Sequence, residues 1–144
     1  MIHLPGPAVD DPGAVQRFAD TWEGAWNSRD PDAVAALCAE DLAFDDPALG
    51  ETVHGREPMR NFVHRMARNY PDYRFTPQGL FADVARRAIL VGWYFTGTLS
   101  GTDCVIGYHG DDRLEVDEDG LVTTYRCLYD NNDVLDQIRR ARSR

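Results

Sequence analysis

The sequence predicts an α+β fold in which three helices precede a long antiparallel sheet. Apolar residues recur at helical spacing in the first half of the chain, whereas residues 73–130 are rich in β-branched and aromatic residues interrupted by turn sequences. Helices and strands that occupy separate parts of a chain favour a layer of helices packed on a sheet. The length of 144 residues suits a single domain. We expect that domain over residues 13–138, between a flexible arm (1–12) and a basic tail (139–144).

Two helices are predicted before residue 40. The first covers about residues 15–26, where Trp22 and Trp26 lie on one apolar face four positions apart. The second begins at Asp30, which has the side chain of an N-cap, and Pro31 occupies its first helical position. Both helices should therefore bury one face against the sheet.

A third helix and the strands follow. The helix begins near Pro58, presents Phe62 on its apolar face and ends at Tyr70-Pro71-Asp72, because a residue before proline is disfavoured in a helix. Residues 133–144 suggest a short helix or a frayed tail. The expected strands cover residues 42–46, 80–84, 87–100, 104–116 and 121–129.

Composition excludes several classes of function. The formal net charge of −9 argues against nucleic acid and anionic membranes as partners, because both select basic surfaces. The longest apolar run, residues 88–95, is too short to span a bilayer, and the first residues lack the features of a secretory signal. The three cysteines and four histidines show no metal-ligand spacing. We therefore expect a cytoplasmic protein without a metal or cofactor.

The segment Phe44-Asp45-Asp46-Pro47 is the first candidate site. Pro47 lacks an N–H group and biases Asp46 toward an extended conformation, so Asp46 should lie at a strand end. A carboxylate at the mouth of an apolar pocket is suited to proton transfer, because desolvation raises its pKa. A solvated turn without chemistry is the alternative interpretation.

Short segments along nearly the whole chain carry a resemblance to known proteins. They are Ala25-Trp26-Asn27, Ala36-Leu37, Ala39-Glu40-Asp41, Asp46-Pro47, His54-Gly55, Phe62, Pro71-Asp72 and Asp119-Gly120-Leu121-Val122. In these segments, within about residues 14–138, the sequence resembles the nuclear transport factor 2-like (NTF2-like) superfamily, in particular its ketosteroid isomerase and SnoaL-like polyketide cyclase branch. The resemblance implies a cone in which a curved sheet wraps around the helices and encloses an apolar pocket. It is weak for any one activity, because such a fold hosts enzymes and binding modules.

The resemblance also implies roles for particular residues. In the isomerase pattern, the general base corresponds to Asp46, and a protonated aspartate that donates to the substrate oxygen corresponds to Asp112. The tyrosine of that pattern corresponds to Trp22, which argues against steroid isomerisation. The cyclase pattern places its catalytic aspartate on Cys127 and its histidine on Asp112. The pattern of limonene-type epoxide hydrolases is not met, because Asp112 and Arg113 are adjacent and point to opposite faces.

Several of these candidates have two interpretations. Asp112 either faces the pocket, on the same strand face as Tyr108, or is a solvated carboxylate near a turn, depending on strand register. Cys127 is either a small buried hydrophobe or a nucleophile. His54 either lines the pocket rim or is a solvated loop residue. The expected pocket walls are Trp22, Trp26, Phe44, His54, Phe62, Tyr108, Tyr125, Cys127 and Tyr129.

Two functions follow from these features. The first is an enzyme of isomerase, lyase or cyclase type that uses Asp46 and Asp112 as acid and base on an apolar carbonyl compound or polycyclic metabolite. The second is a non-catalytic module that binds a small ligand in the same pocket. For the assembly we expect a homodimer that pairs through the outer face of the sheet, around Arg126 and part of the strand at residues 87–100.

Overall fold

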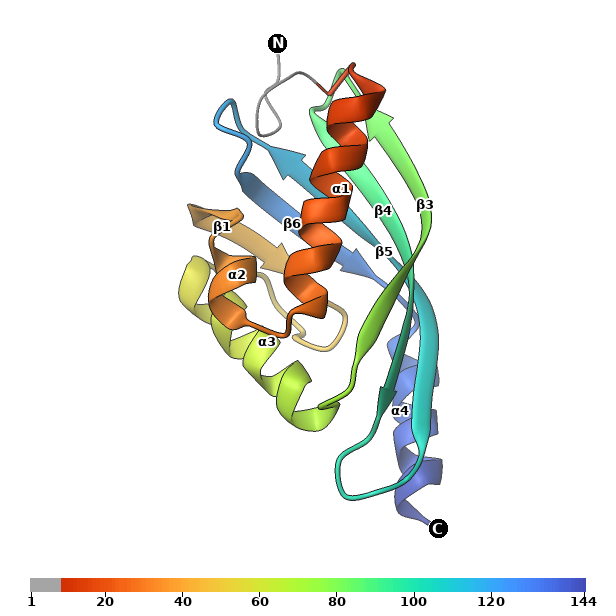
Figure 1. Cartoon of the computed structure of the whole chain (residues 1–144). Helices are drawn as coiled ribbons and strands as arrows, with labels where there is room; N and C mark the ends of the chain where they lie inside the picture. Colours follow the sequence, from red (N-terminus) through yellow and green to blue (C-terminus); the bar gives the residue numbers. More distant parts are fainter. Residues whose placement is uncertain (1–8) are drawn as a thin grey trace.

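The computed structural model describes residues 9–144 and has helices on one face of a six-stranded sheet (Figure 1). The strand order is β2-β1-β6-β5-β4-β3. The fold class predicted from the sequence is confirmed. The expected arm lies mostly outside the described residues, although Val9 is buried in the core. No helix within residues 9–144 has both the length and the apolar character that crossing a bilayer requires.

The first two helices form as the capping residues predict. Helix α1 (Pro12–Asn27) begins at Asp11, whose side chain accepts hydrogen bonds from the amides of residues 13 and 14, so it starts earlier than expected. Helix α2 (Pro31–Ala35) begins at Asp30 and has only five residues. Trp22 and Trp26 are almost fully buried, because α1 lies across the inner face of the sheet (Figure 1).

The order of the strands determines which residues meet at the site. Strand β1 (Cys38–Asp45) pairs in parallel with β6 (Val122–Leu128), which pairs antiparallel with β5 (Val105–Val116). The sheet continues with β4 (Ala88–Thr98) and β3 (Arg74–Asp83), both paired antiparallel. Strand β6 therefore lies between β1 and β5, and its side chains lie between those of the two strands.

The remaining differences from the predicted elements lie in short segments. Strand β1 begins four residues earlier than expected, at Cys38. The expected irregular loop after Pro47 contains the two-residue strand β2 (Val53–His54), which pairs with β1. Helix α3 (Arg56–Asn69) begins two residues before Pro58.

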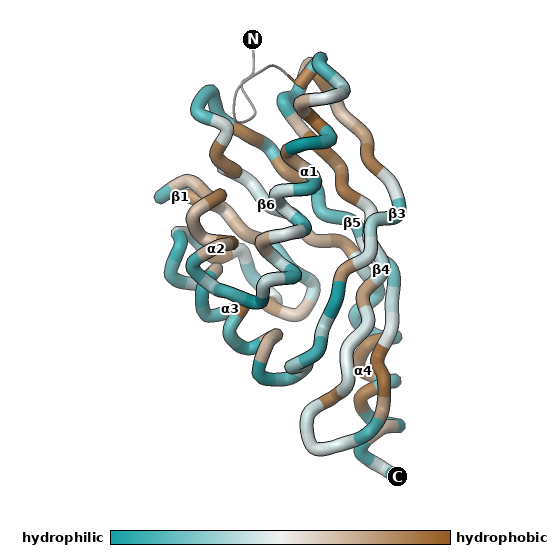
Figure 2. Tube along the Cα trace, viewed as in Figure 1, coloured by the Kyte–Doolittle hydropathy of each residue, from teal (hydrophilic) through white to brown (hydrophobic). Residues whose placement is uncertain are grey.

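The C-terminal segment is a helix along most of its length. Helix α4 (Asn131–Arg142) includes four of the six residues expected in the basic tail. Ala141, near the end of the helix, is buried, so this last turn packs against the protein. Brown and teal segments alternate along α4 in Figure 2, as in a helix with one buried face. The side chain of Gln137 accepts from the Gly107 amide (3.0 Å) and donates to the Gly107 carbonyl oxygen (2.7 Å). Helix α4 thereby pairs with backbone N–H and C=O groups of β5 at a position where β6 has already ended.

Gly110 shows how tightly the inner layer is packed. A Cβ atom at this position would overlap the ring of Trp93 and lie 2.8 Å from the Leu128 carbonyl oxygen. We expect Gly110→Ala to lower the free energy of unfolding by about 2–3 kcal/mol, because neither neighbour can move without disturbing the sheet. Gly24→Ala is the matched control, because its Cβ would meet no atom within 4 Å, and it should be neutral or stabilising by about 0.5–1 kcal/mol. Urea unfolding of both variants measures the difference, and equal effects would contradict this packing.

The outer face of the sheet carries several exposed apolar side chains. Arg126 is exposed there, and Phe81, Val105 and Leu128 are exposed by 67%, 64% and 45%. The homodimer expected through this face stays a prediction, because the structure contains one chain.

Candidate functional site

Asp46 lies directly after the end of β1 and is only 8% exposed. Its Oδ1 atom accepts hydrogen bonds from the Tyr129 hydroxyl (2.6 Å) and from the Ala48 amide (2.8 Å). Burial raises the pKa of Asp46, and the Tyr129 and Ala48 hydrogen bonds, then the Cys127 thiol and the Arg65 charge, oppose that rise. Because both of those hydrogen bonds end on Oδ1, the carboxylate is held in one orientation with Oδ2 left for another partner.

Asp112 lies on β5 and is 4% exposed. The Trp22 indole N–H donates to its Oδ2 (2.9 Å), and the Tyr125 hydroxyl donates to its Oδ1 (3.0 Å). Burial raises the pKa of Asp112 to about 6, against the hydrogen bond from Trp22 and the effects of Trp93, Tyr125 and Cys127. The strand register therefore turns Asp112 inward, toward the core, and not into a solvated turn.

Cys127 lies between the two carboxyl groups. It is the direct partner of Asp112 in the β5–β6 pair, and the neighbouring Arg126 is the partner of Asp45 in the parallel β1–β6 pair. Burial and the charges of Asp112 and Asp46 raise the pKa of the Cys127 thiol well above its ordinary value. The thiol therefore stays protonated, which favours the interpretation of Cys127 as a small buried residue.

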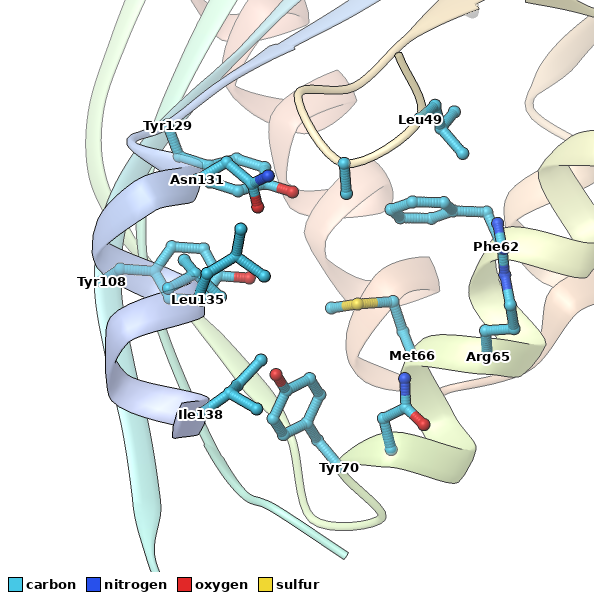
Figure 3. Close-up of a pocket in the computed structure, with 13 residues that line it drawn as sticks. Leu49, Phe62, Arg65, Met66, Tyr70, Tyr108, Tyr129, Asn131, Leu135 and Ile138 are labelled. Atoms are coloured by element: carbon cyan, nitrogen blue, oxygen red, sulfur yellow. The ribbon is translucent and has the colours of Figure 1, made fainter. Parts of the chain in front are cut away.

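Two cavities share part of their walls, and Asp46 lines the smaller of them. The inner cavity has a volume of about 20 Å³, and Asp46, Trp26, Trp93 and Tyr125 line it. The outer cavity, of about 210 Å³, lies between α3, α4 and the loop after β1. Figure 3 shows the outer cavity, with Tyr108 and Tyr129 on the sheet side, Phe62 and Met66 on α3, and Leu135 and Ile138 on α4. The residues common to both cavities are Phe62, Met66, Tyr108 and Tyr129.

The structure brings together most of the residues expected in the pocket wall. Those that line the inner cavity with Asp46 are Trp26, Phe62, Tyr108, Tyr125, Cys127 and Tyr129. Asp112 lines neither cavity. Only one of the two carboxyl groups, that of Asp46, therefore belongs to a cavity wall.

Three expected wall residues lie elsewhere. Trp22 is 1% exposed and donates its indole N–H to Asp112, and it is not among the residues that line the inner cavity. Phe44 is fully buried, with its ring centroid 5.1 Å from that of Phe62 and 4.7 Å from that of Tyr125. His54 is exposed on β2, at the edge of the sheet, because that short strand pairs with β1 outside the cavities. These three residues line neither of the two cavities.

Other lining residues were not expected from the sequence. Met66 follows Phe62 by one helical turn on α3, so helical spacing was a signal that could have identified it. Trp93 shares the inner face of β4 with Phe95, although a strand pattern alone does not say which face is inner. Leu135 and Ile138 depend on the position of α4 over the pocket, for which the sequence carries no signal.

The rim of the outer cavity carries one cation. The Arg65 guanidinium lies over the Phe62 ring, 5.7 Å from its centroid, and Arg65 lines the cavity. Asn69 and Asn131 are the other polar residues of the outer wall besides the tyrosines. Within residues 9–144 no group of three His, Cys, Asp or Glu side chains is arranged to hold a metal ion.

A comparison with models of protein families identifies the family of this chain. A model of the SnoaL-like domain matches residues 15–125, most of the chain. The chain belongs to the SnoaL-like family. Solved structures of the NTF2-like superfamily, to which this family belongs, have the same arrangement of helices on a curved sheet. The resemblance seen in the sequence is therefore confirmed, and a search of curated proteins finds no match.

Three similar structures illustrate the range of the fold. A protein with a ketosteroid isomerase-like fold from Catenulispora acidiphila, in complex with trimethylamine, is 21% identical, with a TM-score of 0.73 and coverage of 82% of this chain and 88% of that one. A putative polyketide cyclase from Xanthomonas campestris is 21% identical, with a TM-score of 0.75 and coverage of 86% and 96%. SalBIII, an epoxide hydrolase/cyclase-like enzyme with a role in pyran ring formation in the polyether salinomycin, is 17% identical, with a TM-score of 0.75 and coverage of 85% and 95%. At these identities the likeness shows the fold alone.

Proposed function

We propose that this SnoaL-like protein is an enzyme in which Asp46 moves a proton to and from a carbon atom next to the carbonyl group of an apolar substrate. The observation that carries the proposal is the position of Asp46: a buried carboxylate beside an apolar cavity, with burial raising its pKa. A general base is most effective when its pKa approaches the working pH. The cyclase and cyclase-like enzymes of similar fold support a small-molecule reaction of this kind.

In the proposed reaction Asp46 is the only protein group that changes its protonation state, and it returns the proton that it takes. The carboxylate takes the proton from the substrate carbon and becomes a neutral acid, while the electron pair moves to the carbonyl oxygen. The acid then returns the proton to a different carbon in an isomerisation, or to a newly formed alkoxide in a cyclisation. Tyr129 orients Asp46 through the hydrogen bond to Oδ1, and burial keeps the pKa of Tyr129 above its ordinary value, so it remains a donor.

Asp112 has a different role in this proposal from the one implied by the resemblance. Asp112 accepts hydrogen bonds from Trp22 and Tyr125 and lines neither cavity, so a substrate in the cavities would not contact it. We assign Asp112 as a positioning residue that holds the Tyr125 ring in the wall of the inner cavity. Removal of the Asp112 side chain should disturb the Tyr125 ring and so change the affinity for substrate. The rate of proton transfer by Asp46 should stay the same.

The cavity volumes favour a small substrate. About 210 Å³ is below the range of roughly 300–1,000 Å³ that is typical of sites for drug-sized ligands. A molecule with one or two rings therefore suits the outer cavity better than a four-ring steroid. The apolar lining from α3 and α4 suits the hydrocarbon part of such a molecule, and its reactive end would point toward Asp46.

Hydrogen–deuterium exchange tests the proposal without knowledge of the natural substrate. We expect the protein to accelerate the exchange of protons next to the carbonyl in 1-tetralone, a β,γ-unsaturated cyclic ketone or a β-keto thioester, measured by NMR in D2O. The rate should rise with pH as Asp46 loses its proton, through a pKa above the ordinary aspartate value. Binding of these compounds without any exchange above that of the buffer would contradict the enzyme.

A non-catalytic binding module is the second candidate. The observation that favours it is that Asp112 lines neither cavity, which leaves a single carboxyl group in the cavity wall instead of an acid and base pair. The exchange experiment separates the two functions, because a binding module would hold the ketones and leave their protons unchanged.

A further inference from the structure

Trp26 has a buried hydrogen-bond donor without an acceptor. The residue is 3% exposed, and its indole Nε1 makes no hydrogen bond to any residue that the structure describes. Buried polar groups are nearly always hydrogen-bonded, because the loss of water is otherwise uncompensated. Trp26 also lines the inner cavity with Asp46, so the acceptor that it lacks could come from a molecule in that cavity.

The other two tryptophans have carboxyl groups beside them. The Trp22 N–H donates to Asp112, at 2.9 Å. The Trp93 N–H makes no hydrogen bond of ordinary geometry, but Trp93 is among the groups that lower the pKa of Asp112. Trp22 therefore has a partner, and Trp93 lies close enough to Asp112 to affect its pKa, whereas Trp26 has neither.

The indole of Trp26 is held in place by its surroundings. The Trp26 carbonyl oxygen accepts a hydrogen bond from the Tyr73 hydroxyl, and the next residue, Asn27, exchanges two hydrogen bonds with the backbone of Phe75 (2.8 and 3.0 Å). These contacts fix the last turn of α1 against β3. The rings packed around the indole, at centroid distances of 5.6–6.4 Å, are Trp22, Phe62, Phe75 and Tyr125. These packed rings hold the indole in the orientation in which its N–H has no partner among the described residues.

We propose that the Trp26 indole N–H binds the carbonyl oxygen of the substrate. The inference rests on the proposed function, since it places that oxygen in the same cavity as Asp46. The inner cavity of about 20 Å³ holds about one water molecule, so an oxygen atom can enter it while the rings of the substrate stay in the outer cavity. A fixed donor in a dry site also stabilises the negative charge that develops on this oxygen.

This assignment moves the donor by one helical turn from the position implied by the resemblance. Trp22 and Trp26 share a face of α1, but only Trp26 lines the cavity with its N–H free. Tyr108 could provide a second donor, because it lines both cavities and its hydroxyl makes no hydrogen bond to the described residues. Figure 3 shows the Tyr108 ring at the wall of the outer cavity, on the side of the sheet.

Two probes of the same shape test the assignment by binding alone. 1-Tetralone and tetralin differ by a carbonyl oxygen, and their affinities can be measured by calorimetry with the whole chain. We expect the protein to bind tetralone about five- to tenfold more tightly, as one hydrogen bond to a buried donor predicts. In ¹H–¹⁵N spectra, the Trp26 indole proton should shift downfield with tetralone and not with tetralin, while the signal of Trp22, whose N–H donates to Asp112, stays in place.

Variants provide the control. Trp26→Phe should remove the preference for tetralone, whereas Tyr94→Phe, which deletes a hydroxyl group from a residue of β4 that lines neither cavity, should keep it. Equal affinities of the wild type for the two probes, no binding of tetralone, or an unchanged Trp26 signal would overturn the assignment, and a trapped water would then be the partner of Trp26. The indole spectra of the wild type decide the matter even where Trp26→Phe does not fold. A preference that depends on Trp26 without proton exchange would keep this inference and overturn only the enzyme.

Discussion

Asp46→Asn is expected to lower the rate of enzyme-catalysed proton exchange by about 10²- to 10⁴-fold, the usual contribution of a general base. Asparagine has the same shape as aspartate, and its Oδ1 can still accept the hydrogen bonds from Tyr129 and Ala48. The amide cannot take a proton at neutral pH, so the variant loses the chemistry and keeps the pocket. Exchange of 1-tetralone followed by NMR measures the rate, and calorimetry checks that the affinity changes little.

The adjacent residue supplies a matched control for this variant. Asp45 is the last residue of β1 and accepts a hydrogen bond from the Thr52 hydroxyl on the other side of the strand. Asp45→Asn changes the net charge by the same amount one position away and should leave the exchange rate within about twofold, since it is not part of the cavity wall. Equal losses in both variants would show that charge in general, and not the Asp46 carboxylate, supports exchange.

Asp112 should make the stability of the protein strongly dependent on pH. Burial raises its pKa from 3.8 to about 6, so the folded state holds the proton more tightly than the unfolded state. Its contribution is therefore fully favourable below about pH 4 and is lost as the pH rises through 6. A shift of about two pKa units corresponds to about 3 kcal/mol.

Asp112→Asn removes this dependence. We expect the free energy of unfolding of the variant, relative to that of the wild type, to increase by about 3 kcal/mol between pH 4 and pH 8. Glu23 adds to the effect in the same direction, because the Asp112 charge is one of the causes, after burial and Asp20, that raise its pKa to about 7. If the variant loses the hydrogen bonds from Trp22 and Tyr125, its free energy of unfolding is lowered by the same amount at every pH, so the dependence on pH is unaffected.

Urea unfolding across this pH range measures the difference between the two proteins. Asp111→Asn is the control, because its side chain lies on the opposite face of β5, over Gly92, and should change stability by no more than about 0.5 kcal/mol. A difference between Asp112→Asn and the wild type that stays constant with pH would mean that Asp112 titrates as an ordinary surface carboxyl group.

Local chemistry in the sequence was sufficient for much of the fold. Asp30 and Pro31 begin α2 as expected, and the turns around Gly101 and Gly120, both with positive φ, separate the strands where the sequence placed them. The position of Asp46 at a strand end followed from Pro47 alone. These features depend on residues within a few positions of one another, so a linear sequence contains the information they need.

The sequence by itself thus determined the class of fold, the family resemblance and the two aspartates, and the tertiary structure decided what each site residue can do. The order of strands places Cys127 between Asp46 and Asp112, although 81 and 15 positions separate it from them in the chain. Trp22 and Trp26 look equivalent on one helical face, but contact with Asp112 occupies the first indole and leaves the second free in the cavity. Hydrogen-bond partners and burial arise from elements that meet only in the folded chain, and these long-range contacts separate a structural tryptophan from a ligand-binding one.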